Sequence, residues 1–278
     1  MGPTASGKSL TAIEKAKELN GEIISADSRQ IYKEFNIATA KPSLEEQEGV
    51  AHHLIDVISP DEGYTVAEFA DSAQRIIKEI TERGKTPIVA GGTGLYFRIL
   101  LEDYDLPRVA PNVELRNELE TCDADKLYSM LEELDPVCAK MLHPNNKVKI
   151  IRALEVIKAT GMPMSSLLRK KAESQFEVEW IGLNARDRQF LYNRIDKRTD
   201  MMIEKGLVDE AKCLYTKYGK IPSLMNTIGY QELIEHFEGK IDFDKAVSSI
   251  KQNTRRYAKR QLSWFRANEK INWHYIDG

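Results

Sequence analysis

Gly2-Pro3-Thr4-Ala5-Ser6-Gly7-Lys8-Ser9 is the stretch that decides the fold of this chain. It matches the pattern GxxxxGK[ST] at every fixed position, and an apolar helical period begins inside it. The glycines let backbone N–H groups wrap around phosphate oxygens, the helix N-terminus adds positive potential, and the lysine supplies a point charge. The hydroxyl of Ser9 is suited to bind Mg²⁺ beside a phosphate. The stretch, called here the phosphate loop, therefore predicts a site for a phosphorylated small molecule.

The segments around this loop alternate between helix and strand patterns, which predicts a parallel sheet flanked by helices. Between residues 107 and 173 the pattern changes to helical segments without a convincing strand. We therefore expect an α/β fold of the P-loop NTPase type, with a core domain at residues 1–106 and 174–278 and an all-helical insertion at 107–173. The expected strands are 21–27, 53–57, 87–90, 179–183 and 271–276, the last of which should close the sheet, and the expected core helices are 6–19, 66–83, 187–205, 208–217, 230–237 and 243–265.

One part of the motif's usual context is missing. A phosphate loop normally follows a buried strand, yet only Met1 precedes Gly2. Each apolar residue lost from such a strand removes about 1.5 to 3 kcal/mol of burial. We therefore expect that about six apolar residues, the length of an ordinary strand, would raise the melting temperature if they were placed ahead of Met1.

Composition excludes several classes of protein. The chain has 278 residues and a net charge of −3, so it carries no uniformly basic coat for nucleic acid. Its three cysteines lie far apart without CxxC spacing, which predicts neither a disulfide framework nor a zinc site. No apolar run is long enough to span a bilayer, and no signal-peptide layout is present. These features predict a cytoplasmic, soluble protein without a membrane partner, and with no obvious interface between copies we expect a monomer.

Two polar sites follow predicted strands, at the edge where open α/β sheets bind ligands. Asp27 is a candidate general base, although an Asp-Ser pair is also typical of a turn or a helix cap. In Gly91-Gly92-Thr93-Gly94, the threonine hydroxyl and free N–H groups would suit a second phosphate or a leaving group, and a simple tight turn fits equally. Asp56 has a weaker claim, as a magnesium ligand inside the strand expected at 53–57.

Basic residues gather on the last predicted helix. Residues 251–267 contain no acidic side chain, and Tyr257, Trp264 and Phe265 stand among the positive charges. This mixture suits phosphate contacts and stacking on an exposed base, while an amphipathic helix with solvated charges explains it as well. Arg194 and Arg198, one helical turn apart, are spaced to clamp a phosphate.

Several strings, taken together and in order, resemble the tRNA dimethylallyltransferase family, also called tRNA isopentenyltransferases, over essentially the whole chain. The strings are GPTASGKS, ISADSRQIYK, NIATAKPS, HHLIDVISP, VAGGTGLY, HPNNKVKIIRALEV, IGYQEL and YAKRQLSWFR. The resemblance implies transfer of a dimethylallyl group from dimethylallyl pyrophosphate to the exocyclic amine of the adenine just 3′ of the tRNA anticodon. It also implies Mg²⁺ as cofactor and a helical insertion that grips the anticodon arm.

The resemblance further implies roles for particular positions. Asp27 would accept the amine proton, with Thr93 and Arg198 as the other catalytic residues, and Lys8, Ser9, Thr93 and Arg198 would face the pyrophosphate, with Ser9 on the metal. The substrate-binding residues would be Gly2, Pro3, Thr4, Ala5, Ser6, Gly7, Lys8 and Ser9. The tRNA-binding residues would be Asp27, Ser28, Arg29, Gln30, Thr93, Arg116, Val148, Lys149, Ile150, Ile151, Arg152, Asn226, Thr227, Ile228, Gly229 and Tyr230.

Two other functions fit parts of the pattern. A small-molecule or nucleotide kinase shares the core fold, the phosphate loop and arginine clamps, and it would bind ATP. An RNA-binding module with a vestigial phosphate site would bind tRNA with steep salt dependence and release no product.

Overall fold

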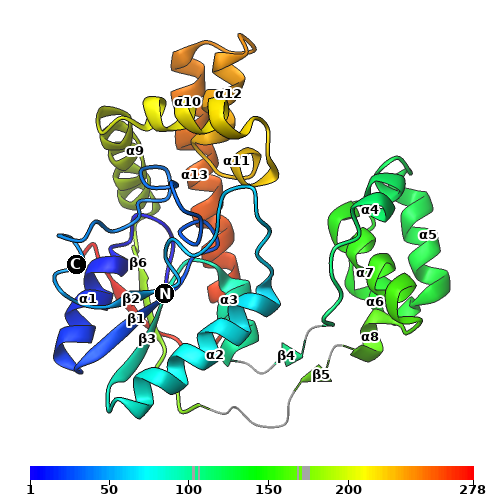
Figure 1. Cartoon of the computed structure of the whole chain (residues 1–278), viewed down its shortest axis with the longest axis horizontal. Helices are drawn as coiled ribbons and strands as arrows, with labels where there is room; N and C mark the ends of the chain where they lie inside the picture. The colour runs from blue at the N-terminus through cyan, green and yellow to red at the C-terminus, as the bar shows by residue number, and fades with distance from the viewer. Residues whose placement is uncertain (102–103, 106, 168, 171–175) are drawn as a thin grey trace. The chain divides into compact units, whose positions relative to one another are not determined.

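The computed structural model describes the chain except for residues 102–103, 106, 168 and 171–175 (Figure 1). Two compact units divide the described residues: Met1–Phe97 with Val178–Gly278 form the core unit, and Arg98–Glu177 form the inserted unit. The inserted unit is thus wider than the predicted 107–173, whose last residue lies outside the described part. Helix α3 (Gly94–Leu101) runs across the first boundary, and its continuous apolar run gave no break from which to read one.

The sheet of the core unit has three parallel strands in the order β2 (His52–His53), β1 (Gly21–Ala26) and β3 (Thr86–Gly91). The middle strand β1 is buried along nearly its whole length and places Ile23, Ile24 and Ala26 in the core, although it also buries Glu22 and Ser25. Helix α1 (Lys8–Glu18) places Ala12, Ile13 and Ala16 against Ile23 of this strand. The phosphate loop is therefore followed by a helix that packs directly on the sheet, as its sequence predicts.

The strand expected at 53–57 is wrong beyond its first residue. The backbone of Leu54 and Asp56 adopts left-handed φ values of 61° and 56°, which ends strand β2 at His53. Asp56 then forms an ion pair with Lys41 at 2.5 Å, far from the expected mid-strand setting. Its carboxylate is engaged in holding this loop.

The strand expected at 271–276 does not close the sheet of β1, β2 and β3. It forms β7 (Asn272–Tyr275), which pairs in parallel with β6 (Ile181–Asn184) as a separate two-stranded sheet. The backbone of Met1 joins β6, because its nitrogen donates to Ile181 O at 2.8 Å and its carbonyl accepts from Leu183 N at 2.8 Å. The start of the phosphate loop is therefore the neighbour of β6.

Seven helices complete the described part of the core unit around these two sheets. Thr65 and Glu68 form a capping box that starts α2, which is the reason this helix begins where the sequence predicts. The helices are α2 (Val66–Glu82), α3, α9 (Arg188–Glu204), α10 (Leu207–Tyr218), α11 (Pro222–Met225), α12 (Tyr230–Phe237) and α13 (Phe243–Phe265). Among the described residues no helix is both long and apolar enough for a bilayer.

The inserted unit packs its helices around one apolar core. Leu127 and Leu131 of α5 and Ile150 of α7 lie at its centre with no exposed surface. The prediction of an all-helical unit needs one correction, because β4 (Tyr104–Asp105) and β5 (Arg169–Lys170) pair antiparallel. Strands of two residues are too short to show a period in the sequence. The helices are α4 (Val113–Glu120), α5 (Ala124–Leu134), α6 (Pro136–Met141), α7 (Lys147–Thr160) and α8 (Met164–Leu167).

Candidate active site

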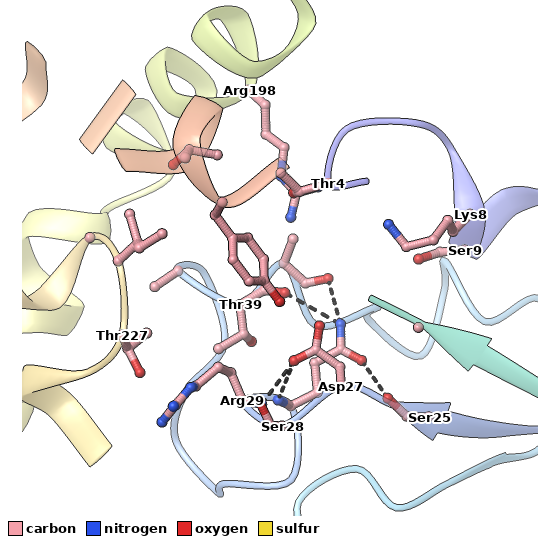
Figure 2. A pocket seen from close by; sticks show the side chains of 18 of the residues that line it. Thr4, Lys8, Ser9, Ser25, Asp27, Ser28, Arg29, Thr39, Arg198 and Thr227 are labelled. Carbon is pink, nitrogen blue, oxygen red and sulfur yellow. Dashed lines mark hydrogen bonds between the residues drawn. The ribbon is translucent and has the colours of Figure 1, made fainter. Parts of the chain in front are cut away.

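A cavity of about 360 Å³ opens in the core unit where the phosphate loop meets the carboxyl ends of β1 and β3 (Figure 2). Side chains from helices α9 and α13 form its other side. Three of the residues predicted to carry the chemistry, Lys8, Asp27 and Arg198, line this one space although they come from distant parts of the sequence. A cavity at this edge of a parallel sheet is the usual place for a ligand.

Asp27 stands at the first position after β1 and turns its carboxylate into the cavity. Its Oδ1 accepts hydrogen bonds from Arg29 N at 2.8 Å and Gln30 N at 3.4 Å, an Asx turn that holds the side chain in place. No described residue donates a hydrogen bond to the other oxygen, Oδ2. The turn expected of an Asp-Ser pair is therefore present, and it leaves one carboxylate oxygen for a ligand.

Two cationic side chains face the same space. Lys8 Nζ donates to Pro3 O at 2.6 Å, and Arg198 makes no hydrogen bond to a described residue. The pKa of Lys8 is lowered to about 7, chiefly by burial and then by the charge of Arg198, against the opposing effect of Asp27. Burial also lowers the pKa of Arg198. Two desolvated cations without a bonded carboxylate form a site for an anion.

Arg194 does not line the cavity with Arg198, and the clamp predicted for these two arginines stays a prediction. Its Nε donates to Ala5 O at 2.8 Å from the side of the phosphate loop, and its side chain does not line the cavity. One helical turn separates the two arginines, yet α9 presents only Arg198 to the cavity. Arg194 supports the backbone of the loop.

Thr93 does not line the cavity, and its contacts are with the backbone on either side of Asp27. Its backbone N donates to Ala26 O at 3.1 Å, and its Oγ1 accepts from Ser28 N at 3.0 Å. The turn Gly91–Gly94, called here the GGTG turn, thus fixes the segment that follows β1. Contact between Thr93 and a ligand stays a prediction.

The segment 226–230 approaches the cavity from the side of α12. Asn226, Thr227, Ile228 and Gly229 line it. Tyr230 is completely buried, packs edge-on against Phe35 and donates its hydroxyl to Glu210 at 2.7 Å. The side chain of Tyr230 is therefore unavailable to RNA in this structure.

Glu210 of α10 is a residue that the sequence prediction missed. Its carboxylate accepts from the backbone N of Asn36, Ile37 and Ala38 at 2.9 to 3.2 Å, in addition to the hydroxyl of Tyr230. It thereby anchors the loop that brings Ala38, Thr39 and Ala40 to the cavity. No sequence signal marks it, because its backbone partners lie more than 170 residues away.

Gln30 fixes the other end of that loop. Its Nε2 donates to Thr39 O and Ala40 O, each at 3.3 Å, while its Oε1 accepts from Ser25 Oγ at 2.9 Å (Figure 2). The segment that follows β1 holds four residues predicted to bind tRNA, and all of them line the cavity: Asp27, Ser28, Arg29 and Gln30. The amide of Gln30 is already committed within the protein.

The predicted tRNA contacts of the inserted unit fall into two groups. Val148 and Lys149 are exposed at the start of α7, whereas Ile150 and Ile151 belong to the apolar core and have no exposed side chain for RNA. A helix that turns one face to its core must bury part of any five-residue run. The tRNA-binding assignment is therefore too broad at these two isoleucines.

Arg116 and Arg152, also predicted to bind tRNA, both contact Glu155 of the same unit. Arg116 makes two hydrogen bonds to this carboxylate at 2.9 and 2.8 Å, and the Arg152 guanidinium is also paired with it. Glu155 is only 1% exposed. Burial alone would raise its pKa, but the hydrogen bonds from Arg116, Asn112 and Arg152 lower it to about 2.

The basic side chains of α13 fall into two groups, those that pair with an acidic residue and those that have no such partner among the described residues. Lys251 pairs with Asp200 at 2.6 Å and Arg255 with Asp196 at 2.8 Å, both on α9. Lys259 and Arg260 are exposed and form no ion pair with a described residue, and Arg260 lines the cavity. The first half of the helix is thus paired with α9, while the second half carries positive charge without an ion-pair partner among the described residues, and its contact with RNA stays a prediction.

A metal ion would find few protein ligands here. Among the described residues no three His, Cys, Asp or Glu side chains gather to hold one. Ser9 and Asp27 both line the cavity and supply oxygen atoms. This donor set fits Mg²⁺, which keeps several waters and is held largely by substrate phosphates.

Comparison with known proteins identifies the family of this chain. A family model described as IPP transferase matches residues 30–268. The chain belongs to the IPP transferase family.

Its relatives match along nearly their whole length. The tRNA dimethylallyltransferase of Carboxydothermus hydrogenoformans is 48% identical over 98% of this chain and 89% of its own length. The tRNA dimethylallyltransferase of Anoxybacillus flavithermus is 45% identical over 98% of this chain and 88% of its own. Sequence relationship within the IPP transferase family therefore covers both units.

Solved structures of IPP transferases agree with this fold. The tRNA isopentenylpyrophosphate transferase of Bacillus halodurans gives a TM-score of 0.75 at 41% identity, covering 99% of this chain and 88% of that one. A eukaryotic dimethylallyltransferase acting on tRNA gives a TM-score of 0.85 at 31% identity, covering 99% of this chain and 72% of that one. The P-loop-like α/β core predicted from the sequence is confirmed.

Proposed function

We propose that this chain transfers a dimethylallyl group from dimethylallyl pyrophosphate to tRNA, at the exocyclic N6 amine of the adenosine 3′-adjacent to the anticodon, and releases pyrophosphate. The observation that carries the proposal is the cavity in which Lys8 and Arg198 face Asp27. It combines an anion site with one carboxylate oxygen to which no described residue donates. A donor that leaves as an anion and an acceptor that must lose a proton require these two features together.

Departure of pyrophosphate is the first demand of the reaction. The bond between the allylic carbon and the pyrophosphate oxygen breaks easily once the charge of the leaving group is neutralised. Lys8 and Arg198 are held in a desolvated cavity before the substrate arrives, so little reorganisation is needed as that charge develops. Binding of the anion favours the protonated, charged form of Lys8.

Bond formation places the second demand on Asp27. The amine nitrogen attacks the allylic carbon, a C–N bond forms as the C–O bond breaks, and one N–H proton must leave. Asp27 Oδ2 is positioned to orient the amine and accept this proton, because the Asx turn fixes the carboxylate. The target adenine must first leave the base stack of the anticodon loop to reach a cavity of this kind.

The cofactor we propose is Mg²⁺, held by Ser9 and the pyrophosphate. When bound it would neutralise part of the phosphate charge. For tRNA we propose contacts from Ser28, Arg29 and the segment 226–229 at the cavity, and from the exposed Val148 and Lys149 of the inserted unit. Because tRNA resides in the cytoplasm, we propose that location for the protein.

The test is an incubation of the chain with unmodified tRNA and either radiolabelled dimethylallyl pyrophosphate or γ-labelled ATP. We expect label to enter tRNA only from the prenyl donor. Phosphoryl transfer or hydrolysis with ATP alone would favour a kinase. Binding of tRNA without incorporation of either label would indicate a non-catalytic RNA-binding protein.

A further inference from the structure

Gln261 of α13 stands between two loops of the candidate active site. Its Oε1 accepts from the backbone N of Thr4 at 2.8 Å, and its Nε2 donates to the carbonyl of Gly92 at 2.9 Å. The residue is 6% exposed. A neutral amide thus bridges the phosphate loop and the GGTG turn, and each of its two ends has a different hydrogen-bonding role.

The GGTG turn is shaped to receive α13. A Cβ atom on Gly92 would lie 2.1 Å from Gln261 Nε2, and one on Gly94 would lie 2.1 Å from Cδ1 of Trp264. Real Cβ atoms do not approach so closely, so glycine at these two positions allows the helix to rest directly on the turn. The contact of Gln261 with Gly92 therefore belongs to a packed interface.

Both loops held by Gln261 lead to reacting groups. Thr4 lines the cavity four residues before Lys8. Gly92 precedes Thr93, whose hydroxyl oxygen accepts from Ser28 N next to Asp27. Gln261 therefore links the phosphate loop, which leads to the anion site, with the GGTG turn, which supports the segment of the general base.

We propose that Gln261 is a positioning residue of the transfer reaction, whose amide holds the phosphate loop and the GGTG turn in register so that the pyrophosphate and Asp27 face each other correctly. The inference rests on the function proposed above. Gln261 acts through Thr4 and Gly92 and does not itself exchange a proton or a bond. Small displacements of reacting groups have large effects on rate, which gives such a residue its importance.

The asymmetry of the two hydrogen bonds provides a test that packing alone would not satisfy. In Gln261→Glu an ionised carboxylate still accepts from Thr4 N, but it repels Gly92 O. A protonated carboxyl restores both hydrogen bonds, because its hydroxyl donates to Gly92 O. Burial next to a carbonyl raises the pKa of such a carboxyl. The Tyr257 hydroxyl hydrogen-bonds to Gln261, and the charges of Asp27, Arg29 and Arg260 act on that hydroxyl.

The experiment compares Gln261→Glu, Gln261→Met and the matched control Gln252→Glu, an exposed glutamine on the same helix. Prenyl transfer is measured from pH 6 to pH 8.5 with saturating tRNA, each rate being divided by that of the wild type at the same pH. We expect Gln261→Met to lose roughly tenfold or more in kcat/KM at every pH, as for a lost buried hydrogen bond. Gln261→Glu should lose as much at pH 8.5 and recover toward pH 6, while Gln252→Glu stays within about twofold.

A second measurement separates this inference from the proposed function. Binding of inorganic pyrophosphate, followed by calorimetry, needs no prenyl transfer and should weaken in Gln261→Met. Kinetics and pyrophosphate binding equal to the wild type in Gln261→Met would overturn the inference, as would a Gln261→Glu activity ratio that does not change with pH. Neither result would contradict the proposed function, which fails only if the wild type does not transfer the prenyl group.

Discussion

At the scale of single residues, substitution of Asp27 is the most direct test of the proposed chemistry. We expect Asp27→Asn to lower kcat by a factor of roughly 10² to 10⁴, because the amide cannot take the proton of the amine. Binding of tRNA should change little, since the asparagine keeps the size and the turn of the original residue. Transfer kinetics and a tRNA binding curve measure the two effects.

The control for this substitution is Asp209→Asn, on an exposed position of α10. It removes the same charge away from the cavity and should leave kcat unchanged. If Asp27→Asn lost transfer and tRNA binding to the same extent, a role in proton transfer would not explain the result.

Glu22, buried at the start of β1, predicts how the core unit responds to acid. Burial alone would raise its pKa, but hydrogen bonds from His53, Lys85 and Arg83 lower it from the ordinary 4.5 to about 2. The unfolded chain therefore binds more protons over this interval. The stabilisation by Glu22 is complete above about pH 4.5 and is lost as the pH falls toward 2.

We expect the urea midpoint of the wild type to fall more between pH 7 and pH 3 than that of Glu22→Gln, which has no carboxylate to protonate. The three tryptophans, Trp180, Trp264 and Trp273, all lie in the core unit, so their fluorescence follows its unfolding. Glu14→Gln, an exposed control on α1, should behave as the wild type. Equal losses in the wild type and Glu22→Gln would contradict the assignment.

At the scale of elements, α13 joins two functions along its length. Its first half pairs with α9 through Lys251 and Arg255, and its second half carries Lys259 and Arg260 without an ion-pair partner among the described residues. Gln261 and Trp264 of the second half rest on the GGTG turn. One helix therefore carries exposed positive charge without an ion-pair partner among the described residues and also supports the phosphate loop.

This division predicts different effects for two lysines of the same helix. Lys259→Gln should weaken tRNA binding a few-fold and reduce the slope of log K against log salt by about 1, as expected for one phosphate contact. Lys251→Gln should change the slope much less, because the charge of Lys251 already faces Asp200. A salt titration of tRNA binding with both variants decides, and equal slopes for the two would count against the division.

At the scale of the whole molecule, the core unit holds two sheets where the phosphate loop usually has one. Among the described strands β3 pairs only with β1 and β6 only with β7, while the backbone of Met1 also bonds to β6. Gly2 lies between them, because a Cβ on Gly2 would meet Leu183 O at 2.4 Å and one on Gly92 would lie 3.8 Å from Gly2 O. A strand leading into Met1 would thus run between β3 and β6.

We expect an apolar segment of about six residues, a typical strand length, to raise the melting temperature by several degrees when it is placed ahead of Met1. It would bury apolar side chains, extend the pairing that Met1 makes beside β6 and offer a partner to the other edge of β3. A Gly/Ser segment of equal length is the control and should have no such effect. Tryptophan fluorescence on heating measures both, and the same melting curve for the apolar segment and its control would refute the idea.

Local patterns were enough for much of the architecture. The ranges expected for the helices at 230–237 and 243–265 agree with α12 and α13, and the start expected at Val66 agrees with α2. The strand expected at 53–57 failed because left-handed residues end it, and such backbone angles leave little trace in an apolar run. The two-residue strands β4 and β5 carried no period at all.

The sequence by itself determined the phosphate loop, the alternation that builds the parallel sheet and the identity of Lys8, Asp27 and Arg198, since each depends on local motif or on family resemblance. Only the tertiary structure decided that these three side chains share a cavity, that Arg194 does not, and that Tyr230, Ile150 and Ile151 are buried. It alone brought out Glu210 and Gln261, whose backbone partners lie more than 160 residues away. Hydrogen bonds across such separations depend on how the elements pack, and the chemistry of neighbouring residues in the sequence does not encode that packing.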